Sequence, residues 1–115
     1  MILEESRMQY ALLIARDETA PGATISDQDA LIALFEKLGP RLKANIRLRP
    51  TSTATSVRIY DGDLVIADGP FAETKEQILG LIVVDCVDLD EAIEVAAQFP
   101  IARLGTIEVR PLWEM

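Results

Sequence analysis

Residues 68–76 read Asp68-Gly69-Pro70-Phe71-Ala72-Glu73-Thr74-Lys75-Glu76. Gly69 accepts a positive φ, while Pro70 fixes its own φ and lacks an N–H donor, so the start of this stretch predicts a sharp, stiff turn. A β-hairpin needs only two turn residues. A charged segment of this length, with one aromatic ring, is therefore more than a simple connection requires.

Strands are predicted on both sides of this stretch. Before it, residues 57–60 and 64–67 are rich in β-branched and aliphatic side chains and flank Asp61-Gly62, a typical hairpin turn. After it, residues 79–86 form a largely apolar strand, interrupted by Asp85. The centre of the chain is therefore a hairpin followed by a buried strand.

The first half of the chain predicts a strand, a helix and a second strand. Residues 9–15 are almost continuously apolar, as in a strand covered on both faces. Ser26 is the expected N-cap of a helix that ends at Gly39-Pro40. In residues 46–49, aliphatic residues alternate with arginines, which indicates a half-exposed strand.

The second half repeats this order. Asp88 and Glu91 have the spacing of a capping box. The helix that follows has an expected buried stripe of Leu89, Ala92, Ile93, Ala96 and Ala97. Residues 106–110 alternate as a last strand. Two strand–helix–strand halves predict an α+β, ferredoxin-like βαββαβ protomer with an extra hairpin. Both helices would cover one sheet face, so a second copy is expected to cover the other and form a homodimer.

Composition limits the class of protein. The chain has 115 residues, a net charge of −8, one cysteine and no histidine. We expect one domain over residues 9–115, preceded by a short extension, residues 1–8, that lacks the features of a secretory signal. The single Cys86 suits a reducing, cytoplasmic location. No stretch is apolar for long enough to span a membrane, and the acidic balance argues against nucleic-acid binding.

The basic residues are concentrated in one region. No acid occurs between Lys37 and Tyr60, whereas six lysines and arginines do. Two interpretations remain open at this point. Basic side chains can protect an exposed strand edge from aggregation, or they can form a local site for an anion within an acidic protein.

The signature resembles that of the DGPF family, in the wider YCII-related group of small bacterial proteins. The resemblance rests on residues 53–58, 68–77 and 88–92, and it is weakest between residues 21 and 50. It implies a dimeric α+β barrel of ferredoxin-like protomers but no settled activity. Related proteins have been proposed as enzymes because a His and an Asp meet in a cleft, and this chain has no His. Relatives are often encoded near extracytoplasmic-function sigma factors, which implies a regulatory context.

Several residues are candidates for a small-molecule site. Lys75 can grip a carboxylate or phosphate, or form an ion pair with Glu73 or Glu76. Asp68 can take part in chemistry or simply stabilise the turn. Phe71 is expected to plug the core rather than to stack on a ligand. Asp85 is either a functional buried carboxylate or a strand end in water.

Arg58 is the preferred anion partner, because a guanidinium binds a carboxylate through two hydrogen bonds. The expected ligand site is therefore Arg58, Asp68, Phe71, Glu73 and Lys75. The catalytic candidates are Asp68, Asp85 and Lys75. No set of residues predicts a metal site, a nucleotide loop or another cofactor site.

Three functions remain open. The first is binding of a small anion in a dimer cleft, with or without proton transfer by carboxylates. The second is a regulatory module that binds a protein partner in transcriptional regulation. The third makes the signature a folding device that fixes the hairpin to the next strand.

Overall fold

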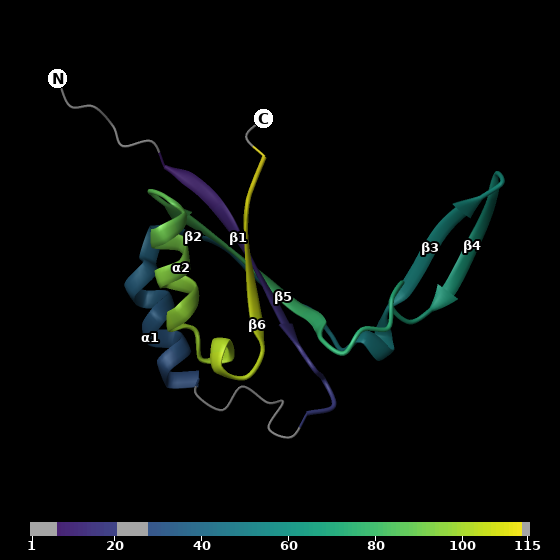
Figure 1. Ribbon diagram of the computed structural model, residues 1–115, viewed down its shortest axis with the longest axis horizontal. Coiled ribbons are helices and arrows are strands. Elements are labelled where there is room, and N and C mark those ends of the chain that lie inside the picture. Colours follow the sequence, from purple (N-terminus) through teal and green to yellow (C-terminus); the bar gives the residue numbers. More distant parts are fainter. Residues whose placement is uncertain (1–6, 21–27, 114–115) are drawn as a thin grey trace.

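The computed structural model describes residues 7–20 and 28–113 (Figure 1). Its helices and strands are β1 (Met8–Arg16), α1 (Gln28–Leu38), β2 (Leu42–Arg47), β3 (Thr55–Tyr60), β4 (Asp63–Asp68), β5 (Gln77–Cys86), α2 (Leu89–Gln98) and β6 (Thr106–Pro111). Short 3-10 turns lie at η1 (Gly39–Arg41), η2 (Thr51–Thr53) and η3 (Pro100–Arg103). This order confirms the predicted sequence of elements, including the additional hairpin.

The main sheet has four strands in the order β2-β5-β1-β6, and every neighbouring pair is antiparallel. Strand β5 lies between β1 and β2, which are joined through α1, and this is the split βαβ arrangement of ferredoxin-like folds. Both helices lie on the same side of the sheet (Figure 1). The α+β ferredoxin-like class is therefore confirmed for the protomer.

The core lies between the sheet and the two helices. From the sheet it takes Tyr10, Leu12, Ile82, Val84 and Cys86, and from the helical side Leu34, Leu38, Ala92, Val95, Ala96 and Phe99. Cys86 is fully buried within this core. Asp88 caps α2 as expected, because its Oδ1 accepts a hydrogen bond from the Glu91 backbone N–H at 2.9 Å.

The opposite face of the sheet is not covered by any described residue. It is apolar over β1, β2 and β5, whereas β6 places Glu108 and Arg110 at its edge, paired with Leu13 and Ala11. Directly paired residues share a face, and the register places Leu13 opposite Leu81, and Leu81 opposite Ile46. Two further aliphatic residues on this face are Val83, paired with Ala11 and Ala44, and Ile78, paired with Ala15. We call this surface, formed by Leu13, Ile46, Ile78, Leu81 and Val83, the open face.

Strands β3 and β4 form a separate two-stranded sheet, which we call the arm. The arm extends away from the main sheet (Figure 1). At its tip, Asp61 and Gly62 both have positive φ, +49° and +81°. This is the backbone of a type I′ turn and explains why Asp-Gly occurs there. Every residue of β4 is exposed.

Some predicted boundaries and faces were wrong. The strand expected at residues 46–49 lies earlier, at Leu42–Arg47, because its partners are on β5 and because Pro50 cannot donate to a ladder and leads into η2. In α2, Leu89 and Ile93 are about half exposed, whereas Val95 is buried. The residues of α2 that meet the sheet are thus Ala92, Val95 and Ala96, and Phe99 packs there directly after the helix. The predicted N-cap Ser26 lies outside the described residues.

Gly105 gives a test of the packing at the end of β1. A Cβ added there would lie 2.3 Å from the Ala15 carbonyl oxygen and 3.2 Å from Arg16 Cβ. Because a backbone atom cannot move aside cheaply, we expect Gly105→Ala to cost about 2–3 kcal/mol of folding free energy. Thermal unfolding should shift down by roughly 10 °C.

The control is Gly62→Asn, at the arm tip, where nothing lies within 4 Å and asparagine tolerates positive φ. Its midpoint should stay close to that of the wild type. Equal stability of the two variants would contradict the described contact between Gly105 and β1.

Candidate functional site

The first part of the signature forms a corner at the base of the arm. Asp68 is the last residue of β4, and Gly69 follows with a φ of +96°. The Gly69 N–H donates to the Ala54 carbonyl at 2.8 Å, and Ser56 Oγ donates to the Gly69 carbonyl at 2.7 Å. These bonds tie both ends of the arm together, as expected if the signature fixes the hairpin.

The second part of the signature is a loop held by its own polar side chains. Gln77 Nε2 donates to the carbonyls of Ala72 and Thr74, at 3.2 and 3.1 Å. Thr74 Oγ1 donates to the Glu76 carbonyl at 2.5 Å. The side chain of Glu76 in turn accepts from Thr106 Oγ1 at 3.2 Å, which connects the loop to β6.

A shallow pocket lies between this loop and the end of β1. We call it the signature pocket, and its lining includes Glu73, Lys75, Asp17, Thr19 and Thr51. Among the described residues, Lys75 forms no ion pair, so the expected pairing with Glu73 or Glu76 is not present. The pocket combines one cation with several acids and is open to solvent.

Two acids beside this pocket are held by threonines. Asp17 Oδ1 accepts hydrogen bonds from Thr19 Oγ1 at 2.6 Å and from the Thr19 N–H at 2.9 Å. These bonds lower the pKa of Asp17, and the nearby charges of Lys75 and Arg16 add to the effect. Glu18 accepts from the hydroxyl and the N–H of Thr51, at 2.6 and 3.0 Å, which connects β1 to the turn before the arm.

The other predicted site residues lie apart from this pocket. Arg58 is paired with Val65 in the middle of the arm, three residues or about 10 Å from the Thr55–Asp68 pair at its base. Phe71 is 88% exposed, so it does not plug the core of the protomer. Of the predicted ligand residues, the structure brings only Glu73 and Lys75 together in one pocket. Their role in binding stays a prediction.

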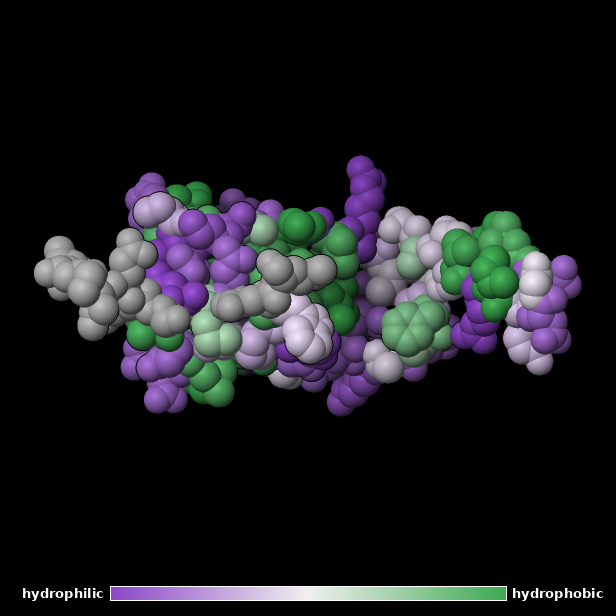
Figure 2. All heavy atoms as spheres, turned by 90° about the horizontal axis from the view of Figure 1, so that it is seen from above, coloured by the Kyte–Doolittle hydropathy of each residue, from purple (hydrophilic) through white to green (hydrophobic). Residues whose placement is uncertain are grey.

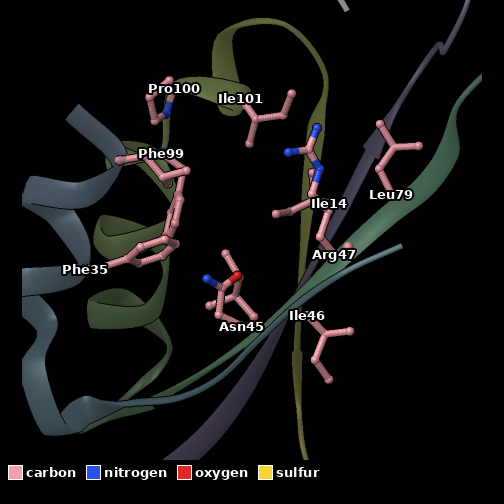
Figure 3. Close-up of a pocket in the computed structure, with 12 residues that line it drawn as sticks. Ile14, Phe35, Asn45, Ile46, Arg47, Leu79, Phe99, Pro100 and Ile101 are labelled. Carbon is pink, nitrogen blue, oxygen red and sulfur yellow. The ribbon is translucent and has the colours of Figure 1, made fainter. Parts of the chain in front are cut away.

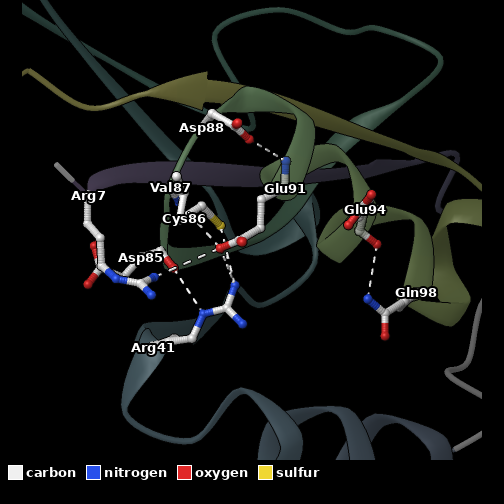
Figure 4. Close-up of polar contacts among 9 residues, drawn as sticks. All are labelled: Arg7, Arg41, Asp85, Cys86, Val87, Asp88, Glu91, Glu94 and Gln98. Carbon is white, nitrogen blue, oxygen red and sulfur yellow. Dashed lines mark hydrogen bonds and ion pairs between the residues drawn. The ribbon is translucent and has the colours of Figure 1, made fainter. Parts of the chain in front are cut away.

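Asp85 lies near the opposite end of β5, about 26 Å along the strand from Gln77. It is half-buried, and its carbonyl accepts a hydrogen bond from Arg41 Nε at 3.2 Å (Figure 4). The same guanidinium pairs with Glu91 at 2.7 Å and contacts Cys86 Sγ. Burial raises the pKa of the Cys86 thiol, against the opposing effect of Arg41. This cluster fastens η1 to the start of α2.

A second pocket, of about 280 Å³, lies between the sheet and the helices. We call it the inner pocket. Its walls are almost entirely apolar: Ile14, Leu31, Phe35, Ile46, Leu79, Gly80, Ile82, Phe99, Pro100 and Ile101. Phe35 and Phe99 form a tilted aromatic pair on its helical side, with ring centroids 6.0 Å apart. A Cβ at Gly80 would lie 2.9 Å from the Ile46 carbonyl oxygen, so a side chain does not fit there.

Two polar side chains complete the inner pocket. Asn45 and Arg47 alternate with Ile46 on β2, and both point towards the side of the sheet occupied by Phe35, Phe99 and Ile101, while Ile46 points away (Figure 3). Within the described part of the chain, neither side chain makes a hydrogen bond or an ion pair. Arg47 is the only charged residue among the described lining. Both polar groups are therefore available to a ligand.

The sequence did not single out Asn45 and Arg47. The acid-free stretch between Lys37 and Tyr60 was the relevant signal, because it contains Arg47 and a local anion site was one of its two interpretations. It could not distinguish Arg47 from its five basic neighbours. Among residues 7–20 and 28–113, no cluster of acids and cysteine suits a metal ion, and no helix is long and apolar enough to cross a membrane.

The sheet order and the two helices on one face define a ferredoxin-like α+β protein. The chain belongs to the YCII-related family, whose domain model matches residues 8–115. It is similar to an uncharacterised protein of Rhizobium meliloti (strain 1021), with 40% identity over 114 residues that cover 91% of this chain and 92% of the relative. The resemblance inferred from the signature is thereby confirmed at the level of the YCII-related family.

The bonds to Asp17 lead to a pH-dependent prediction. Because the folded state lowers the pKa of Asp17, the stabilisation is present above its ordinary pKa and is lost as the pH falls through the lowered value. Thr19→Val removes the largest contribution and should raise the pKa of Asp17 towards its ordinary value. Titration of the Asp17 carboxyl carbon by NMR measures this shift.

Lys75→Gln is the matched comparison, since Lys75 is a smaller contributor to the same pKa. We expect it to raise the pKa of Asp17 by less than Thr19→Val does. A Thr19→Val variant with the wild-type Asp17 pKa would contradict the hydrogen bonds described at the end of β1.

Proposed function

We propose that this protein binds a small anion with an apolar body, such as an aromatic or branched carboxylic acid, in the inner pocket. The observation that carries the proposal is the position of Arg47. Its guanidinium is the only charge among the described residues that line an otherwise apolar pocket. Ligand sites commonly combine apolar walls with a few polar groups that orient the ligand.

The chemistry of the two polar residues fits a carboxylate. A guanidinium can donate two parallel hydrogen bonds to the two oxygens of a carboxylate. The carboxamide of Asn45, two residues earlier on β2, can donate a further one. Asn45 and Arg47 are exposed, so the charged group of the ligand would remain near solvent. This avoids the free-energy cost of burying a charge completely.

The walls set the size and shape of the apolar part. Phe35 and Phe99 offer ring faces and edges, and Ile14 and Ile82 form the sheet side. The pocket volume of about 280 Å³ lies near the small end of ligand pockets, which run from about 300 to 1,000 Å³. A compact ligand with one ring or one branched chain is the class we propose.

The described lining of the inner pocket contains no carboxylate, so we propose binding there rather than acid–base catalysis. The carboxylates Asp17, Glu18 and Glu73 lie at the signature pocket instead. Proton transfer by this protein, if a substrate reaches those groups, would belong to that second site. A role in sigma-factor regulation and a cytoplasmic location stay predictions from the sequence.

We also propose that the protein is a homodimer in which a second copy covers the open face. Leu13, Ile46, Ile78, Leu81 and Val83 support this, because they place five aliphatic side chains on an uncovered side of the described sheet. A sheet with two apolar faces is stable in water only when both are covered. A closed dimer satisfies that requirement with a single interface.

The test of ligand binding is calorimetric titration with a series of small aromatic and branched carboxylates, each paired with its neutral amide. We expect the acids to bind more tightly than the amides. Arg47→Gln should weaken binding of the best acid about 10- to 100-fold, because a charged hydrogen bond is worth about 1.5–3 kcal/mol.

Two variants with the same loss of charge serve as controls. Arg58→Gln alters the arm, and Lys75→Gln alters the signature pocket; both should leave the affinity close to that of the wild type. If Lys75→Gln abolishes binding and Arg47→Gln does not, the ligand site is the signature pocket. Equal binding of acids and amides would contradict an anion site altogether.

A further inference from the structure

The arm has two chemically different faces. Cross-strand pairing places Val57 opposite Ile66 and Ile59 opposite Leu64, and these two pairs share one face. The other face is mixed and includes Arg58, paired with Val65. We call the surface formed by Val57, Ile59, Leu64 and Ile66 the arm patch. This alternation of apolar and polar positions is typical of a strand pair with one buried face.

The arm patch is exposed in the protomer. Its four side chains are 61–66% exposed. Together they present apolar area on the order of 400 Å², as large as the biggest patches on typical monomers. Hydrophobic side chains gather over the arm in Figure 2, well away from the body of the molecule. An isolated two-stranded hairpin is marginally stable in water, so this arm needs a surface to pack on.

The described parts of the protomer do not provide that surface. The corner at Gly69 fixes the base of the arm through hydrogen bonds from Gly69 N–H and Ser56 Oγ. From this base the arm extends away from its own sheet (Figure 1). Within residues 7–20 and 28–113 nothing covers the arm patch, so a second molecule can occupy it.

The open face is a suitable surface for the arm patch to pack on. Over β1, β2 and β5 it is aliphatic like the arm patch, with Glu108 and Arg110 beside it on β6, and it is likewise uncovered among the described residues. In a twofold dimer the arm of each copy can lie on the open face of the other, so that two equivalent contacts form at once. Two such contacts bury on the order of 1,600 Å², the size of a standard stable interface.

We infer that the arm patch of one copy of this chain packs against the open face of a second copy, in a reciprocal exchange of arms. This inference rests on the homodimer proposed above and is independent of the ligand. It assigns the signature a structural role at the interface, because the Asp68-Gly69-Pro70 corner sets the direction in which the arm projects.

Single charged substitutions test each surface. Ile59→Lys places a charge in the arm patch, and Leu81→Asp places one on the open face; each should weaken dimerisation at least 100-fold by sedimentation equilibrium. Val65→Lys is the matched control, since Val65 lies on the other face of the arm and is 45% exposed. It should change the dimer dissociation constant less than threefold. Circular dichroism checks that the variants keep their secondary structure.

A mixing experiment identifies the partner surface. A heterodimer of Ile59→Lys and Leu81→Asp chains has one unaltered arm contact and one Lys–Asp contact, so the mixture should dimerise much more tightly than either variant alone. If the mixture dimerises no more tightly than either variant alone, the arm does not dock on the open face. A monomeric wild type, or a dimer insensitive to Ile59→Lys, also overturns the inference.

The same samples separate this inference from the proposed ligand site. The inner pocket lies on the helical side of the sheet, so a folded Ile59→Lys monomer should still bind the carboxylate found with the wild type. Loss of the dimer with retained binding supports both proposals. An intact, Ile59→Lys-sensitive dimer that binds no carboxylate refutes the ligand site alone.

Discussion

Strand β5 carries aliphatic side chains on both of its faces, and the rest of the structure depends on how these two faces are buried. Ile82 and Val84 point into the core under the helices, while Leu81 and Val83 lie on the open face. Burial of each aliphatic side chain is worth about 1.5–3 kcal/mol, so leaving a whole face in water would forgo a large part of the available stability. The two helices are on one side only. The helices therefore cover one apolar face of the sheet, while no described residue covers the other face, which is apolar over β1, β2 and β5.

The arm presents the same problem on a smaller scale. Its mixed face suits water, but the arm patch does not, and the arm has no core of its own. The hydrogen bonds of Ser56 and Gly69 join the two strands at the base of the arm and fix the direction in which the arm leaves the sheet. Two uncovered apolar surfaces on one chain can be satisfied together by one twofold contact. Phe71, beside the same corner, is 88% exposed and does not lie in the protomer core in which it was expected.

The two pockets differ in the chemistry that they can support. The inner pocket has apolar walls, and its guanidinium and carboxamide are exposed; the proposed binding of an apolar acid rests on this combination. The signature pocket is open and rich in carboxylates, and two of these are already engaged by Thr19 and Thr51. Glu18 connects the segment after β1 to the turn before the arm through Thr51, whereas Asp17 stabilises its own turn through Thr19. The contacts of the signature, residues 68–76, thus account for the position of the arm and of the loop that follows it, but they do not account for ligand binding.

The sequence by itself determined the order of elements, the Asp61-Gly62 hairpin, the Asp88 cap and the ferredoxin-like class, because periodicity, turn chemistry and caps act over a few neighbouring residues. It also showed an acid-free basic stretch between Lys37 and Tyr60, for which strand-edge protection and a local anion site both stayed open. Only the tertiary structure decided that Arg47 faces the inner pocket, that Arg58 lies on the arm apart from Lys75, and that Val95 rather than Ile93 packs on the sheet. These outcomes depend on strand register and on the direction of the arm. Both are set by contacts between segments far apart in the chain, and local patterns carry no information about them.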